Sequence, residues 1–202
     1  MERMKQTKEL KELKKLRLIL IIILSYILIF TVIAVIKRNY EFLYYTFFMS
    51  IMAFLLFRYH NKLYITPVIF MGLAIHGLLA IFGNMVYINN IRLYDIWIIK
   101  RFFRYDNLVH LIGAFVITFI AFKILRHYLD ERLRKNRILF TILLILISLG
   151  VGAFVEIVEL QAVLFLNVGN KIGDYFNNAF DLLYNLFGSI IATLFMRFKN
   201  NF

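Results

Sequence analysis

Between Leu18 and Ile36 the chain reads LILIIILSYILIFTVIAVI, a stretch without one charged side chain. About 20 apolar residues in a helix are enough to cross the hydrocarbon core of a bilayer, which is about 30 Å thick. The stretch is too long for the apolar region of a cleaved signal peptide, and no small-x-small cleavage site follows it. We therefore expect a transmembrane helix that stays in place as a signal anchor.

Similar apolar blocks recur along the 202 residues, which are 62% hydrophobic with a mean hydropathy of +0.76. Soluble domains are nearer 45–50% apolar. We expect an all-α fold: a polytopic membrane protein whose residues 18–202 form a single six-transmembrane-helix bundle. The expected spans are 18–36, 41–58, 64–84, 106–125, 138–159 and 177–196. Pro67 falls in the first turn of the third span, where its missing N–H is tolerated.

Three segments beside these spans have characters of their own. Residues 1–17 carry leucines at three-residue spacing among lysines, which predicts a cytoplasmic amphipathic helix leading into the first span. Residues 85–105 are rich in aromatic side chains, which predicts a helix lying in the membrane interface. The apolar run 160–166 either extends the fifth helix or breaks and folds back.

The net charge of +12 comes from lysines and arginines that flank the apolar blocks. Such residues anchor helices at the lipid head groups, so nucleic acid is not an expected partner. With the N-terminus inside, the inner segments hold 17 of them and the outer segments 7. This split predicts a multi-pass protein of a prokaryotic plasma membrane with both termini in the cytoplasm. The absence of cysteine excludes disulfides and thiolate metal sites.

Acidic side chains stand in the last three spans, where a charge at mid-membrane costs about 2.5–3.5 kcal/mol. In the expected topology spans four and six begin outside and span five ends there, so their polar residues share one depth. Steps of three or four residues keep each set on one helix face. The candidate catalytic and metal-binding residues are Asp106, His110, Glu156, Glu159 and Asp181.

Several chemistries fit this set. Carboxylates with one imidazole suit a divalent cation such as Mg, Mn or Zn, and helical bundles build metal sites from such residues. Clustered carboxylates also suit proton transfer. Polar residues expected to orient these groups or to contact a substrate are Arg104, Asp174, Asn178, Asn185 and Asn84. Arg104 and Arg101 beside Asp106 would hold a phosphate or carboxylate group.

A family resemblance rests on these same residues. The motif residues are Arg104-Tyr105-Asp106, His110 and Gly113; then Glu156 and Glu159; then Gly173-Asp174, Asp181, Asn185 and Gly188. In order and spacing they resemble the YjdF-type inner-membrane proteins, over about residues 76–195. More loosely they resemble the VanZ-like membrane proteins, which are linked to glycopeptide resistance at the cell envelope. The resemblance implies a membrane location and supports these residues, but it implies no substrate.

Three functions remain open. The leading hypothesis is a cation-binding or acid/base site near the outer face, acting on an envelope lipid or a lipid-linked phosphate. The second is proton- or cation-coupled transport, which predicts polar residues through the inner half of the spans as well. In the third, the polar cluster only holds helices together. Glu156 and Glu159 fit this third hypothesis least, because two acids on one face repel unless a cation or a proton lies between them.

Overall fold

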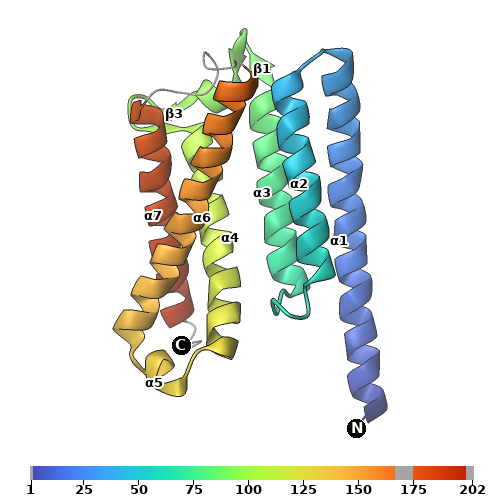
Figure 1. Cartoon of the computed structure of the whole chain (residues 1–202), viewed down its shortest axis with the longest axis vertical. Coiled ribbons are helices and arrows are strands. Elements are labelled where there is room, and N and C mark those ends of the chain that lie inside the picture. The colour runs from blue at the N-terminus through green and yellow to red at the C-terminus, as the bar shows by residue number, and fades with distance from the viewer. Residues whose placement is uncertain (1, 167–174, 199–202) are drawn as a thin grey trace. The chain divides into compact units, whose positions relative to one another are not determined.

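The computed structural model describes residues 2–166 and 175–198, and most of these residues are helical. Within those ranges six helices are long and apolar enough to cross a membrane. They are α1 (Glu2–Ile36), α2 (Tyr40–Arg58), α3 (Pro67–Met85), α4 (Tyr105–Tyr128), α6 (Arg137–Leu166) and α7 (Tyr175–Phe198). The predicted all-α polytopic fold and its six spans are confirmed (Figure 1).

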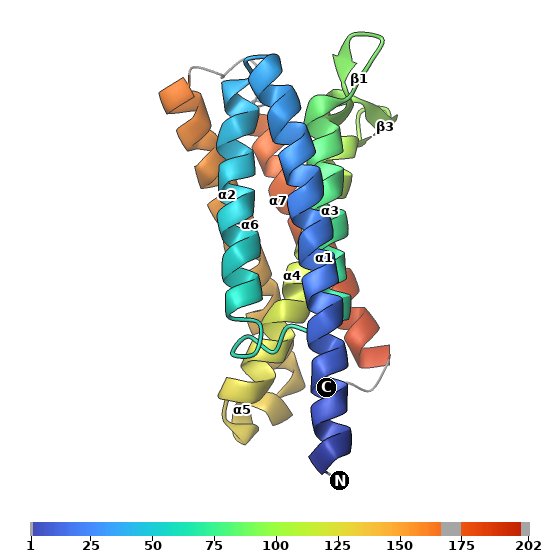
Figure 2. The same cartoon turned by 90° about the vertical axis from the view of Figure 1, so that its right-hand side faces the viewer.

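The chain divides into two compact units, residues Met1–Leu78 and Leu79–Phe202. In the first unit α1 and α2 lie side by side as an antiparallel pair (Figures 1 and 2). Arg38 adopts a left-handed backbone conformation (φ 52°) in the turn between them. Asn39 then caps α2 by accepting a hydrogen bond from the Phe42 N–H (3.1 Å), as N-cap side chains commonly do.

The N-terminal segment is helical and leads into the first span. Helix α1 runs without a break from Glu2 to Ile36, and the cytoplasmic, amphipathic character of its first part stays a prediction. Leucine and lysine both favour helix, and no glycine or proline lies in this segment to end it. The start of α3 agrees with the sequence expectation, since Pro67 is its first residue.

In the second unit α4, α6 and α7 pack against one another as a three-helix bundle. The core near one end of this bundle is apolar. Its residues are Ala121, Phe122, Phe140, Leu144, Ala192 and Met196. The short helix α5 (Glu131–Lys135) lies at that end, and four short strands lie at the other (Figures 1 and 2). The open question over residues 160–166 is settled, because α6 continues straight through them to Leu166.

Residues 85–105 are not the interfacial helix that was expected. They form strands β1 (Tyr87–Ile88) and β2 (Ile91–Arg92), the 3-10 helix η1 (Leu93–Asp95), and strands β3 (Trp97–Ile99) and β4 (Phe103–Arg104). Asn89 and Asn90 both have positive φ between β1 and β2. Two such residues make a type I′ turn, the usual two-residue hairpin connection. Asn-Asn between β-branched and aromatic residues was therefore the sequence signal for a hairpin.

Candidate functional site

The start of α4 is fixed by the side chain of Asn107. The Arg104 backbone N–H donates to Asn107 Oδ1 at 2.9 Å, which closes the first turn from one side. Asp106 therefore lies in the first turn, where the helix dipole favours a negative charge. His110 follows one turn deeper on the same face.

His110 is the centre of the cluster, and its two ring nitrogens face different carboxylates. Nε2 lies 3.6 Å from Asp106 Oδ1 and 3.9 Å from Asp181 Oδ1. Nδ1 lies 3.8 Å from Glu156 Oε1. Helices α4, α6 and α7 thus bring four predicted site residues together around one imidazole. All three distances exceed the range of a direct hydrogen bond.

Asp181 is held by two amide side chains. Asn107 Nδ2 donates to its Oδ1 (2.9 Å) and Asn177 Nδ2 donates to its Oδ2 (2.8 Å). The same Asn177 amide lies 3.3 Å from Asp106 Oδ2, so it links the two carboxylates across α4 and α7. Asp181 is only 1% exposed, so these amide donors replace the water that its carboxylate would otherwise bind.

Glu156 is different, because it is buried and neither of its carboxylate oxygens has a hydrogen-bond partner among the described residues. Buried polar atoms are nearly always hydrogen-bonded, so such an orphan requires an explanation. The Nδ1 of His110 lies 3.8 Å from its Oε1. The carboxylate is therefore placed to act on His110, and it is not one member of a satisfied hydrogen-bond network.

Arg104 connects the cluster to the hairpin end of the unit. Its Nη1 donates to Asn177 Oδ1 at 2.9 Å. Its guanidinium lies 4.3 Å from the centre of the Trp97 ring, its cross-strand partner on β3. Arg104 Nε is buried without a hydrogen-bond partner in the described chain, so one donor of this guanidinium remains unused.

Glu159 lies one turn beyond Glu156 and is half-buried. It is close enough for Coulomb interactions with Glu156, His110 and Asp106. Tyr94 of η1 is close enough for Coulomb interactions with Asp106 and Glu159. Burial raises the pKa of the Tyr94 hydroxyl, and the Asp106 and Glu159 carboxylates raise it further, so the hydroxyl stays protonated and can donate.

The remaining predicted residues take less part in the cluster. Asn185 lies against Gly152 of α6, and its Nδ2 is buried without a hydrogen-bond partner in the described ranges. Asn178 Oδ1 is also buried, and it too has no hydrogen-bond partner among the described residues. Asn84, near the end of α3, is half-buried and is not part of the hydrogen-bond network around Asp181. Asp174 lies outside the described residues.

Two residues of the site were missed by sequence reasoning, Asn107 and Asn177. Asn107 stands next to Asp106, and only its capping geometry turns its amide toward α7. Asn177 and Asn178 are four and three residues before Asp181, and both spacings place a side chain on the same face. The sequence signal was therefore present for both Asn177 and Asn178, and the packing of α7 on α4 selected Asn177.

A cation fits this arrangement. One ligand atom from each of Asp106, His110 and Asp181 can be chosen so that all lie within 4.8 Å of one another. Zinc at about 2.0–2.2 Å from tetrahedral N and O ligands separates those ligands by about 3.4 Å. His110 Nε2 lies 3.6 and 3.9 Å from the nearer oxygens of Asp106 and Asp181, and the chosen oxygens of the two aspartates lie no more than 4.8 Å apart.

Comparison with known proteins gives the family. Searches among curated proteins and among solved structures found no match to the chain. A family model described as "Predicted membrane protein (DUF2238)" matches residues 16–201, and this family is the YjdF type. The looser VanZ-like resemblance stays a prediction. The match begins inside α1 and includes the other five long helices and every described residue of the cluster, and the chain therefore belongs to the DUF2238 family of membrane proteins.

Proposed function

We propose that this protein binds a divalent cation through Asp106, His110 and Asp181, and that the site does acid/base chemistry on a phosphate-bearing lipid at the outer face of the plasma membrane. One observation carries the proposal. His110 directs Nε2 toward two aspartates, while its Nδ1 faces Glu156. A carboxylate behind a metal-binding histidine fixes the ring tautomer and leaves the other nitrogen free to bind the metal.

This geometry suggests different roles for the carboxylates. Asp106 and Asp181 are the ligands, and Glu156 orients His110 through Nδ1, so Glu156 is not itself a ligand. Asn107 and Asn177 hold the Asp181 carboxylate in place. Such outer-shell partners commonly change metal affinity by 10–100-fold when they are replaced.

Charge supports the proposal against a purely structural cluster. Asp106, Glu156 and Asp181 bring three carboxylates to one imidazole, with side-chain exposures of 19%, 10% and 1%. Buried charges are normally paired or coordinate metals. A cluster whose only role is to join helices would satisfy its own hydrogen bonds, and the two oxygens of Glu156 do not.

Catalysis also needs a place for substrate. Three protein ligands leave a coordination position open, as catalytic zinc sites do. The unused Nε of Arg104 offers a donor to a phosphate oxygen, and a guanidinium suits phosphate geometry. Glu159 would accept or return a proton beside that position, with the protonated Tyr94 hydroxyl as a neighbouring donor.

Transport ranks second because the polar character stops partway along the bundle. Beyond the cluster, the interior of the second unit passes through Ser148 and Thr118, whose hydroxyls both donate to Ala114 O. It then becomes the apolar core around Phe122 and Phe140. A one-sided site fits this pattern better than a path for ions through the unit.

Metal analysis tests the proposal. The purified wild-type protein, loaded with Zn, Mn or Mg and then desalted, is expected to keep about one ion per chain, and Asp181→Asn is expected to keep none. Asp130→Asn is the matched control, because Asp130 caps α5 at the other end of the unit and asparagine caps equally well. Equal and negligible metal in all three proteins would overturn the cation site.

Activity is tested separately. Wild-type protein and His110→Ala are incubated in liposomes with phosphatidic acid or an isoprenoid diphosphate, and the products are followed by mass spectrometry. Turnover by the wild type alone supports acid/base chemistry on lipid phosphate. Pumping driven by a pH gradient, without turnover, would favour transport.

A further inference from the structure

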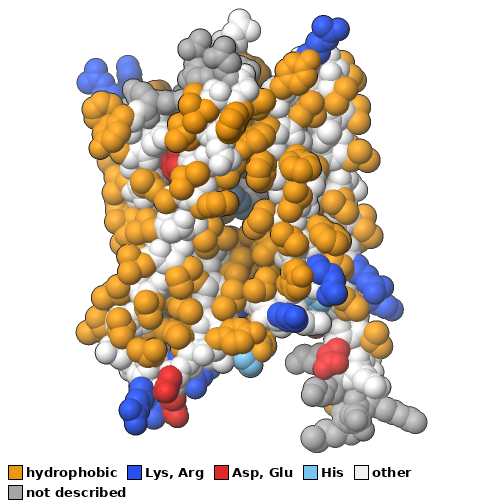
Figure 3. Space-filling view, viewed as in Figure 1, with side chains coloured by type: hydrophobic (Ala, Val, Ile, Leu, Met, Phe, Trp, Pro, Cys, Tyr) orange, Lys and Arg blue, Asp and Glu red, His pale blue; other side chains and the backbone are white. Residues whose placement is uncertain are grey.

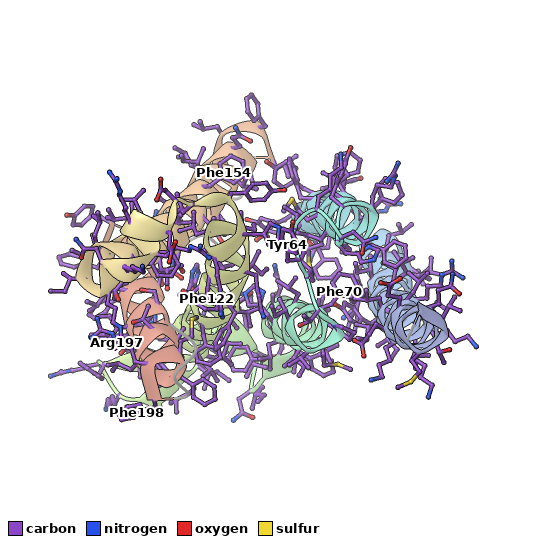
Figure 4. All side chains as sticks on the ribbon, turned by 90° about the horizontal axis from the view of Figure 1, so that it is seen from below. Tyr64, Phe70, Phe122, Phe154, Arg197 and Phe198 are labelled. Carbon is purple, nitrogen blue, oxygen red and sulfur yellow. The ribbon has the colours of Figure 1, made fainter. Side chains whose placement is uncertain are left out.

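The end of the second unit opposite the cluster contains a basic pocket. Its volume is about 380 Å³. The lining residues are Phe122, Arg126, Glu131, Arg134, Lys135, Arg137 and Phe140. Figure 3 shows Lys and Arg side chains at this end of the unit, and Figure 4 looks onto it with Phe122 labelled.

We infer that this pocket binds the phosphate head group of an anionic phospholipid. The inference does not rest on the proposed function. Glu156 follows Arg137 by nineteen positions on α6, which is about 28 Å along the helix, so the pocket and the proposed cation site are distinct.

Charge is the first argument. Four cations line the pocket and one acid opposes them. That acid, Glu131, already pairs with Lys135 at 2.9 Å. The lining therefore has more cations than acids around a concave space. Basic pockets at the cytoplasmic ends of transmembrane helices are where anionic lipid head groups bind.

The position of the arginines is built into the fold. Arg134 Nη1 donates to the Arg126 carbonyl at 3.0 Å, which joins α5 to the end of α4. The Arg126 guanidinium lies 5.7 Å from the centre of the Phe122 ring. Arg137 begins α6, a long helix whose N-terminal N–H groups favour an anion. The three guanidinium groups thus reach the pocket from three consecutive elements.

Apolar side chains in the lining and on the adjoining surface favour a lipid over a free phosphate. Phe122 and Phe140 line the pocket, pack edge to face (ring centroids 6.0 Å apart) and are both buried. On the outer side of the same turns of α6, Ile138 and Ile142 are 71% and 47% exposed. A ligand with a phosphate and acyl chains would contact both surfaces, whereas a soluble phosphate would use only the cationic rim.

Binding of a short-chain phosphatidylglycerol to the purified protein in detergent tests the inference. Arg134→Gln and Arg137→Gln are each expected to weaken binding about fivefold, the factor that corresponds to about 1 kcal/mol per basic residue. Arg132→Gln is the matched control, since Arg132 lies on the same short helix but does not line the pocket. The lipid affinity of Arg132→Gln should equal that of the wild type. Arg137→Lys should bind the lipid nearly as well as the wild type, because lysine keeps the positive charge.

Three results would overturn the inference. Equal losses in Arg132→Gln and the pocket variants would mean non-specific attraction to a basic surface. Equal binding of short-chain phosphatidylcholine would remove the role of net lipid charge. Equal binding of glycerol phosphate would assign the pocket to a soluble phosphate. Melting curves of each variant separate loss of binding from loss of folding. If Arg134→Gln unfolds the end of α4, the binding measured for Arg137→Gln still tests the inference.

Discussion

Replacing Glu156 with Gln is expected to have opposite effects on the metal-free and the metal-bound protein. Without metal, the carboxylate is buried and its oxygens lack hydrogen bonds. With metal, the same carboxylate would orient His110 and strengthen its Nε2 as a ligand. Gln removes the charge while keeping the shape of the side chain, so the two effects can be measured in one variant.

The magnitudes follow from the geometry. Glu156 Oε1 lies 3.8 Å from His110 Nδ1, beyond hydrogen-bond range, so little offsets its desolvation. A buried unsatisfied polar group costs about 1–3 kcal/mol, and a charged one costs more. Gln should therefore raise the free energy of unfolding of the metal-free protein by about 1 kcal/mol. Loss of the partner behind the histidine should weaken metal binding about 10–100-fold, or about 1.4–2.7 kcal/mol.

Thermal unfolding in detergent with a chelator, and calorimetric titration with zinc or manganese, measure the two quantities. The melting temperature of Glu156→Gln should exceed that of the wild type in chelator, and the order should reverse in excess metal. Glu159→Gln is the comparison variant, because it makes the same chemical change one turn further along α6. Its metal affinity should change much less, since none of the contacts to His110 within 4 Å comes from Glu159.

A different pattern would refute the reasoning. If Glu156→Gln is equally destabilised with and without metal, Glu156 is structural and its role behind His110 is wrong. If the wild type gains no stability from any divalent cation, the cation site itself is wrong.

Three more predictions concern packing, capping and topology. Gly188→Ala should lower the free energy of unfolding by about 1–3 kcal/mol, because a methyl group there would overlap Leu111 O of α4. Gly150→Ala should be neutral or stabilising, because its new Cβ would meet no neighbouring element within 4 Å. Chemical denaturation in mixed micelles compares the two variants. Asn107→Ala should remove about 1 kcal/mol of capping energy and a hydrogen bond to Asp181, which together would lower the melting temperature and metal retention. A reporter fused to the C-terminus should be active in the cytoplasm, and periplasmic activity would contradict the predicted orientation.

The sequence was sufficient for the spans because membrane insertion depends on local composition. Each observed helix start and end lies within about three residues of the expected span for α2, α3 and α4, and Pro67 marks the start of α3. Uncharged runs of about 20 residues have few alternatives in a bilayer, since each must pair its own backbone groups. The same reasoning gave the depth of the acidic residues, and the structure brings Asp106, His110, Glu156 and Asp181 together.

The segment 85–105 shows where local composition was not enough. Its aromatic and basic residues fit an interfacial helix and a pair of hairpins equally well. The structure has two hairpins, and their turns contain Asn89, Asn90 and Arg101 in left-handed conformations. This difference affects the site, because the pairing of Trp97 with Arg104 places the guanidinium beside the cluster.

The sequence by itself determined that this chain crosses a membrane six times and carries its acids on the faces of its last three helices. Only the tertiary structure decided which side chains meet. A helical period of 3.6 residues leaves Asn177 and Asn178 equally able to face Asp181, and the rotation of α7 against α4 selects Asn177. The same packing places Glu156 beside the Nδ1 of His110 and places Asp106 and Asp181 beside its Nε2. Helix rotation depends on contacts between residues far apart in the chain, and for that reason the proposed division between metal ligands and orienting groups could not be derived from spacing alone.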